Sequence, residues 1–126
     1  MSRLRREIGG MLEVDPRPGG FGAVLAVDPK LSVFPDHFRD GPILPGICLV
    51  QAVLTGAASS RGVEEMRVRT LKTLKLTQPV RPGQRVQIEA EMTPGASGDF
   101  AIKAKLSVAD RRCAEISMIA AEGAGQ

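Results

Sequence analysis

The chain has 126 residues, enough for one domain with a sizeable hydrophobic core. Apolar residues make up 43% of the sequence and charged residues 25%, with a net charge of only +3, so the composition excludes a largely disordered chain. Two cysteines and one histidine are too few for a disulfide framework, a zinc quartet or a histidine-rich metal site. Because Trp and Tyr are absent and Phe occurs four times, stacking platforms are scarce, and nucleic acid is not an expected partner.

The basic start of the chain is not followed by an apolar segment, and the sequence contains no run of about 18 apolar residues. We therefore expect neither a secretory signal nor a membrane span, and we predict a cytoplasmic protein. A single domain over residues 1–126, with its core at about 11–121, is the predicted organisation.

The first predicted unit is a β-hairpin. A short strand from about Met11 to Val14 leads into the Pro- and Gly-rich stretch Asp15–Gly20, which reads as a turn. A second strand follows over Phe21–Val27, where apolar side chains alternate on one face.

A long irregular segment, Asp28–Pro45, separates this hairpin from the next element. It holds four prolines and the single histidine, His37. A loop of this length inside a compact domain is uncommon and usually functional.

One helix is predicted, from Gly46 to about Ser60. A proline, here Pro45, is tolerated where a helix starts, and apolar residues follow on every face, which indicates a helix buried all round. Gln51 and Thr55 interrupt the apolar run and share one face, since they are four residues apart. Each needs a hydrogen-bonding partner, because burying a polar group without one is costly.

The rest of the chain reads as strands. The stretch Val68–Val80 breaks its alternation, which predicts a β-bulge near Leu71–Leu74. Clean alternation then predicts a meander of three strands, each with one buried face, at Val86–Met92, Phe100–Val108 and Ala114–Ala120. A hairpin and a meander that share one curved antiparallel sheet, wrapped around one long apolar helix, give an α+β fold.

The loop and the helix start resemble a known segment. The run Phe34-Pro-Asp-His-Phe-Arg-Asp-Gly-Pro-Ile-Leu-Pro-Gly-Ile47 is similar to the His-Phe-x-x-x-Pro-x-x-Pro-Gly loop of the β-hydroxyacyl-acyl-carrier-protein dehydratases of bacterial fatty-acid synthesis, which have the hot-dog fold. The turn Gln78–Gly83 is similar to the Arg-Pro-Val-x-Pro-Gly turn of that family. The resemblance covers roughly Leu12 to Ala120.

The resemblance implies a 3-hydroxyacyl thioester dehydratase. It assigns His37 as the base that removes the α-proton, and the Gly46 N–H as the hydrogen-bond donor to the thioester carbonyl. General chemistry supports both of these roles. Histidine titrates near neutrality, and a helix N-terminus stabilises the negative charge that develops on an enolate oxygen.

The chain departs from the family pattern at Gln51. The family carries Glu or Asp there, supplied by the opposite subunit, and this group protonates the leaving hydroxyl. An amide donates a hydrogen bond but transfers no proton at neutral pH. The glutamine one turn later in the family is Thr55 here. Asp36 and Asp40 are alternative sources of the acid through a rearranged loop; otherwise they are solvated turn formers.

The resemblance also implies an acyl tunnel at a subunit interface, formed when two chains pair strand edges. A homodimer or higher homo-oligomer is therefore expected, with the acyl group arriving on the phosphopantetheine of acyl carrier protein or coenzyme A. No metal or redox cofactor and no membrane partner are implied. The residues expected to contact substrate are Phe34, Phe38, Pro45, Ile47 and Thr55.

The sequence is also compatible with two other functions. Gln51 is the best evidence for a non-catalytic acyl-thioester-binding paralogue or a hetero-oligomer subunit. A hot-dog thioesterase is a weaker alternative, because such enzymes generally activate water with a carboxylate on or near the helix, and none precedes Glu64 there.

Individual residues also have plain structural interpretations. His37 reads alternatively as a loop histidine bonded to a backbone carbonyl, and Gln51 as a purely structural hydrogen bonder. Cys48 is either a nucleophile at a helix N-terminus or a small buried apolar residue, and the latter is favoured for it and for Cys113. The basic residues of the following strand region meet an acidic carrier protein or form a solvated face; they are Arg61, Arg67, Arg69, Lys72 and Lys75.

Overall fold

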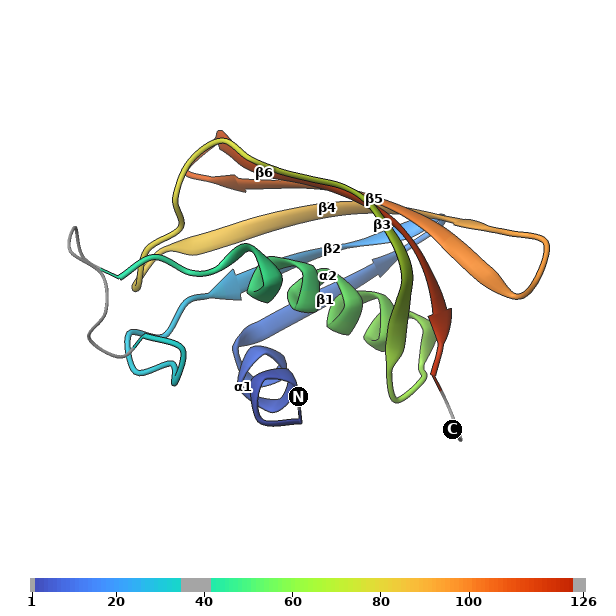
Figure 1. Cartoon of the computed structure of the whole chain (residues 1–126), viewed down its shortest axis with the longest axis horizontal. Coiled ribbons are helices and arrows are strands. Elements are labelled where there is room, and N and C mark those ends of the chain that lie inside the picture. Colours follow the sequence, from blue (N-terminus) through green and yellow to red (C-terminus); the bar gives the residue numbers. More distant parts are fainter. Residues whose placement is uncertain (1, 35–41, 124–126) are drawn as a thin grey trace.

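The computed structural model describes residues 2–34 and 42–123. Within these residues, two helices and six strands follow one another (Figure 1). Their bounds are α1 Ser2–Met11, β1 Leu12–Arg17, β2 Gly20–Ala26, α2 Gly46–Arg61, β3 Met66–Leu76, β4 Arg85–Pro94, β5 Asp99–Val108 and β6 Arg111–Glu122.

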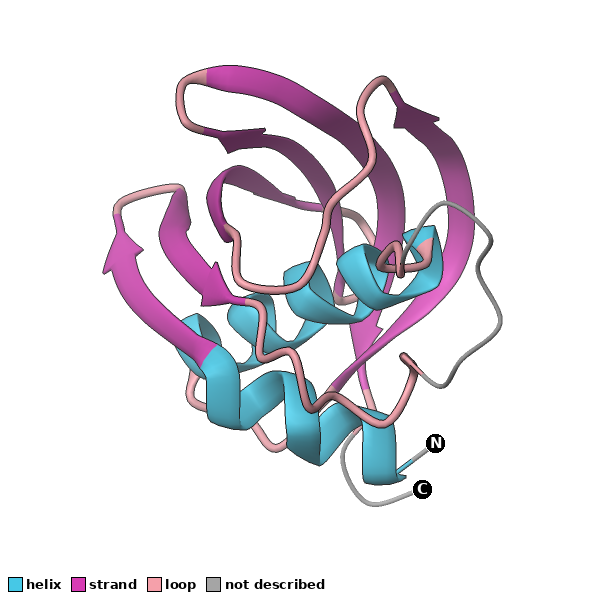
Figure 2. Cartoon of the chain, turned by 90° about the vertical axis from the view of Figure 1, so that its left-hand side faces the viewer, coloured by secondary structure: helices cyan, strands magenta, loops and turns pink. Residues whose placement is uncertain are grey.

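All six strands form one antiparallel sheet with the order β1-β2-β4-β5-β6-β3. The predicted hairpin and meander therefore share a sheet, joined where β2 pairs with β4. Figure 2 shows the sheet curving around α2, with α1 on the same side. The expected α+β architecture, a curved antiparallel sheet around an apolar helix, is confirmed; that helix has 16 residues.

The core lies between the concave face of the sheet and α2. Alternate residues of β4, β5 and β6 are buried, as the sequence pattern predicts. Nine of the residues of α2 are buried as well, and the helix ends at Gly62, whose φ of 71° is a left-handed conformation that suits glycine.

The N-terminal helix α1 was not predicted, and the prediction of a single helix is corrected. Its sequence has three arginines and two glycines, so only Leu4, Ile8 and Met11 form a narrow apolar stripe. Ile8 is fully buried because α1 packs against α2. The core therefore begins before residue 11.

Two strand boundaries also differ from the prediction. Strand β1 continues through Pro16 to Arg17, within the predicted turn, because an edge strand tolerates proline. Strand β3 ends at Leu76 rather than Val80. Its register with β6 shifts between Leu71 and Thr73, where the bulge was predicted, and also between Val68 and Thr70.

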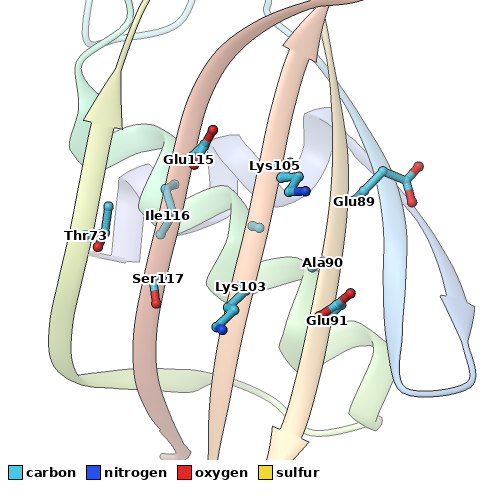
Figure 3. Close-up of a pocket in the computed structure, with 10 residues that line it drawn as sticks. Thr73, Glu89, Ala90, Glu91, Lys103, Lys105, Glu115, Ile116 and Ser117 are labelled. Carbon is cyan, nitrogen blue, oxygen red and sulfur yellow. The ribbon is translucent and has the colours of Figure 1, made fainter.

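The outer face of the sheet is a mosaic of charges (Figure 3). Glu89 and Glu91 on β4 lie opposite Lys105 and Lys103 on β5. A shallow depression of about 530 Å³ lies among these side chains together with Thr73, Glu115 and Ser117. Charges of both signs in alternating rows are typical of a solvated sheet face.

Neither helix in the described part of the chain is long and apolar enough to cross a membrane.

Candidate functional site

The start of α2 lies beside the end of β3. Pro45 occupies the N-cap position with extended backbone angles and offers no side-chain cap, so the first N–H groups of the helix lack the usual capping oxygen. A Cβ added to Gly46 would lie 3.1 Å from Leu76 Cδ1 and 3.3 Å from Leu74 Cδ2. Glycine thus lets the backbone of the helix start approach an apolar wall.

Both ends of the loop that contains His37 are fixed to the body of the protein. On the N-terminal side, the Ser32 N–H and Oγ–H donate to Glu7 Oε1 of α1 at 3.1 and 2.8 Å. On the C-terminal side, the Leu44 N–H donates to the Val80 carbonyl at 2.7 Å. Phe34 packs half-buried against the core. His37, Phe38, Asp36 and Asp40 lie outside the described residues.

Gln51 and Thr55 satisfy each other. Gln51 Nε2 donates to Thr55 Oγ1 at 3.0 Å, and both side chains are half-buried on α2. This hydrogen bond gives each of the two polar side chains on the otherwise apolar helix a partner. The amide lies at a groove of about 480 Å³ whose walls come from α1, α2 and the start of β3; the lining residues are Arg5, Gln51, Leu54, Glu65, Met66, Arg67 and Val68.

Glu65 is the one carboxylate among the residues that line this groove. It accepts hydrogen bonds from Arg67 Nε at 2.7 Å and from Arg5 Nη1. The Arg67 guanidinium, together with Arg5, holds the pKa of Glu65 below its usual value. The carboxylate stays ionised at neutral pH, so it does not replace the proton donor that Gln51 lacks.

Cys48 has the properties of a buried apolar residue. Its side chain is fully buried, and this burial, with Glu7 nearby, raises the pKa of the thiol to about 11. Burial also raises the pKa of Cys113. A thiol that stays protonated at neutral pH is a poor nucleophile, in agreement with the structural interpretation of both cysteines.

Apolar side chains are exposed next to the helix start. Ile47 on α2 is 55% exposed and Leu76 on β3 is 52% exposed. Val68, Leu71 and Leu74 of β3 are also exposed. An uncovered apolar strip of this kind marks an interaction or ligand surface rather than a solvated one.

The structure therefore brings Gly46, Pro45 and Ile47 together at one end of α2, with Gln51 and Thr55 one to two turns further along. It adds Arg5, Glu65 and Glu7, which the sequence analysis did not identify. The local sequence does not predict their roles, because each of them bonds to a residue far along the chain. Arg5 and Glu65, for example, are 60 positions apart. The described residues contain no group of three or more His, Cys, Asp or Glu side chains placed to hold a metal ion.

Comparison with known proteins identifies relatives that are dehydratases. The model of the ApeI-like family, described as ApeI dehydratase, matches residues 18–115. The 3-hydroxyacyl-[acyl-carrier-protein] dehydratase FabZ of Caulobacter sp. (strain K31) is 32% identical over 95 residues, covering 69% of this chain and 58% of FabZ. FabZ of Bacillus cereus (strain AH820) is 32% identical over 89 residues, covering 66% of this chain and 61% of FabZ. The chain thus spans about three-fifths of the length of these relatives.

Solved structures agree on the fold. A chain of the dehydratase heterocomplex ApeI:P from Xenorhabdus doucetiae superposes with a TM-score of 0.66 at 19% identity, covering 88% of this chain and 94% of that one. The E. coli PaaI protein of the phenylacetic acid degradation operon superposes with a TM-score of 0.67 at 12% identity, covering 96% of this chain and 88% of that one. These likenesses support the hot-dog fold. With a family model that spans most of its length, the chain belongs to the ApeI-like dehydratase family of hot-dog proteins.

Proposed function

We propose that this protein is a 3-hydroxyacyl-thioester dehydratase subunit of acyl-chain biosynthesis that acts in the cytoplasm. The observation that carries the proposal is the start of α2, where Gly46 approaches Leu74 and Leu76 closely and exposed apolar side chains lie alongside. The family membership and the dehydratase names of the relatives support the same reaction.

The substrate is an acyl thioester on the phosphopantetheine arm of acyl carrier protein or coenzyme A. The polar thioester lies at the helix start, and the acyl chain lies along apolar residues. Ile47 and Pro45 contact it from α2, and Phe34 and Phe38 contact it from the loop.

In the reaction, His37 takes the α-proton, and the electrons of that C–H bond form the new C=C bond. The C–O bond at the β-carbon breaks, and the hydroxyl leaves as water with a proton taken from solvent, while the proton on His37 returns to solvent. The Gly46 N–H donates to the thioester carbonyl as negative charge builds on its oxygen, and the positive end of the helix dipole adds to this stabilisation. No metal or redox group takes part.

Gln51 is the hydroxyl-side partner, and it limits the rate. Its amide orients the leaving hydroxyl by hydrogen bonding, while Thr55 holds the amide in place. A positioned general acid typically contributes about 10²- to 10⁴-fold to a rate, and this chain lacks one at position 51.

The test is enoyl-thioester hydration and 3-hydroxyacyl-thioester dehydration by the purified protein, beside His37→Ala and Gln51→Glu. We expect slow turnover by the wild type, none by His37→Ala, and a gain of about 100-fold or more in Gln51→Glu. Release of free acid and thiol would instead identify a thioesterase. Failure of all three proteins on several chain lengths would overturn the proposal.

A second candidate is an acyl-thioester binder without turnover, and Gln51 is the observation that favours it. In that case the wild type binds an acyl-pantetheine thioester, measured by calorimetry, yet forms no enoyl product. Activity that appears only in Gln51→Glu would support this candidate over the first.

A further inference from the structure

Three charged side chains line the groove beside Gln51, together with apolar ones. The charged side chains come from three different parts of the chain: Arg5 from α1, Glu65 from the connection between α2 and β3, and Arg67 from β3. The remaining lining residues, apart from Gln51, are apolar; they are Leu54, Met66 and Val68. We call this hollow of about 480 Å³ the Gln51 groove, and its three charged residues the Arg5–Glu65–Arg67 trio.

The trio is held in place by packing as well as by charge. Glu65 accepts a hydrogen bond from Arg5 on one carboxylate oxygen and from Arg67 Nε, at 2.7 Å, on the other. The backbone carbonyl of Glu65 accepts from the Gly123 N–H at 3.1 Å. A Cβ on Gly123 would lie 2.8 Å from Arg67 Nε, so the backbone after β6 packs directly against the ion pair. The two guanidinium groups are therefore oriented before any ligand arrives.

The groove has an excess of positive charge. Two guanidinium groups and one carboxylate leave a net charge of +1 in the Gln51 groove. The adjoining hollow of about 310 Å³ shares Arg5 and Glu65 and adds Arg6 and Glu64, whose charges cancel. A guanidinium carries five N–H donors, and within the described residues Arg5 and Arg67 each bond only to Glu65. Spare donors in a fixed planar fork are suited to binding a carboxylate.

The Gln51 groove is also in reach of the helix start. Gly46 lies beside Leu74 and Leu76 at the end of β3, whereas Gln51 shares the groove with Val68 near the start of that strand. Because an α-helix rises 1.5 Å per residue, Gln51 lies about 8 Å along α2 from Gly46. An acyl group whose thioester lies at the helix start, and which extends past Gln51, therefore brings its far end to the trio.

We propose that the acyl substrate ends in a carboxylate, and that Arg5 and Arg67 bind this carboxylate in the Gln51 groove. The apolar lining residues contact the methylene chain between the thioester and the carboxylate. An acyl chain that ends in a methyl group would remove water from three charged side chains without offering them a new partner, which is unfavourable. The position of the thioester rests on the proposed function, whereas the binding of a carboxylate by the trio does not.

Two coenzyme A thioesters that differ only at the far end of the acyl group test the proposal. One is the monothioester of a straight-chain dicarboxylic acid with about six to ten carbon atoms, and the other is the methyl ester of the same compound. Calorimetry measures both dissociation constants for the wild-type protein. We expect the carboxylate to bind about tenfold more tightly than the methyl ester at the chain length that reaches the trio, with a smaller ratio at high salt.

Variants of single arginines locate the binding. Arg5→Gln and Arg67→Gln each remove one guanidinium and should each remove most of the tenfold ratio. Arg17→Gln is the matched control and should keep the wild-type ratio. Arg17 is likewise paired with a carboxylate, that of Asp15 at 3.3 Å, but it lies on β1 at the opposite edge of the sheet. Circular dichroism verifies that each variant is folded.

Three results would overturn the proposal. The first is a methyl ester that binds as tightly as the carboxylate at every chain length. The second is a preference for the carboxylate that survives unchanged in both Arg5→Gln and Arg67→Gln. The third is failure of both thioesters to bind, which would also count against the proposed function.

Hydration of the corresponding trans-2-enoyl thioesters separates this inference from the proposed function. Faster hydration of the carboxylate-ended compound, lost in Arg67→Gln, supports both. Preferred binding of the carboxylate without any hydration supports this inference and counts against the proposed reaction. Hydration of both compounds, with no preference for the carboxylate in binding or rate, supports the reaction and overturns this inference.

Discussion

At the scale of single residues, Gly56 decides how closely α2 approaches the sheet. A Cβ at this position would overlap the ring of Phe21 on β2, and that ring is itself almost fully buried. Glycine inside a helix costs about 0.5–1 kcal/mol relative to alanine. Only glycine fits at this position, because the aromatic ring already fills the space that a methyl group would need.

Gly56→Ala should therefore destabilise the protein despite its gain in helix propensity. Overpacking a filled core typically costs about 1–3 kcal/mol, which exceeds the helix gain. Gly10→Ala in α1 is the matched control, since nothing lies within 4 Å of an added Cβ there, and we expect it to be neutral or stabilising by up to about 1 kcal/mol. Urea unfolding measures both, and a Gly56→Ala protein as stable as the wild type would refute the packing argument.

At the scale of elements, α1 anchors the loop that leads to His37. Glu7 accepts both hydrogen bonds from Ser32, and Arg3 Nε donates to the same carboxylate at 3.2 Å. The Ser32 side-chain hydrogen bond is the main reason why the pKa of Glu7 lies below its ordinary value. One function of α1 is therefore to hold the described part of this loop, besides covering α2 with Ile8.

The lowered pKa of Glu7 predicts a pH-dependent contribution to stability. Because the folded-state pKa lies below the ordinary value of 4.5, the contribution is fully present above about pH 5 and is lost as the pH falls through the folded value. Unfolding of the wild type and Glu7→Gln should differ at pH 7, and the difference should shrink as the pH falls below 4.5. The same substitution at exposed Glu13 controls for the lost charge. A wild-type advantage that does not shrink as the solution is acidified would contradict this anchor.

At the scale of the whole molecule, the two edge strands β1 and β3 determine where a strand of another chain can pair with the sheet. The concave side of β3 presents leucines that the described residues leave partly exposed, while β1 ends in charged residues and a proline. The outer face of the sheet is a charged mosaic, which disfavours packing of two sheets face to face. Pairing of a further strand with β3 would therefore bury apolar side chains that are exposed in this chain.

Hydrogen exchange tests which edge is used. As the protein concentration rises and chains associate, amides of peptide 66–76 should exchange more slowly, because the edge of β3 gains hydrogen bonds. Amides of peptide 12–17 should exchange at the same rate at every concentration. Protection confined to β1 would contradict the assignment of the interface.

Much of the fold and part of the candidate site follow from the sequence alone. The alternation of apolar residues over Val86–Met92 and Phe100–Val108 predicts strands with one buried face, because side-chain direction depends on immediate neighbours. The apolar run after Pro45 predicts α2, and the motif at the start of that helix indicates its family. Pro45, Gly46 and Ile47 are placed together for the same local reason.

Only the tertiary structure decides the rest. Helix α1 has too few apolar residues to be recognised, and it is defined by packing of Ile8 on α2. The ion pair of Arg5 with Glu65 and the hydrogen bonds of Glu7 to Ser32 join residues 60 and 25 positions apart. Whether a strand is central or at an edge is equally invisible in its own pattern, because β3 and β6 are both apolar on one face. Packing against residues far along the chain buries the apolar face of β6 and leaves the apolar face of β3 partly exposed.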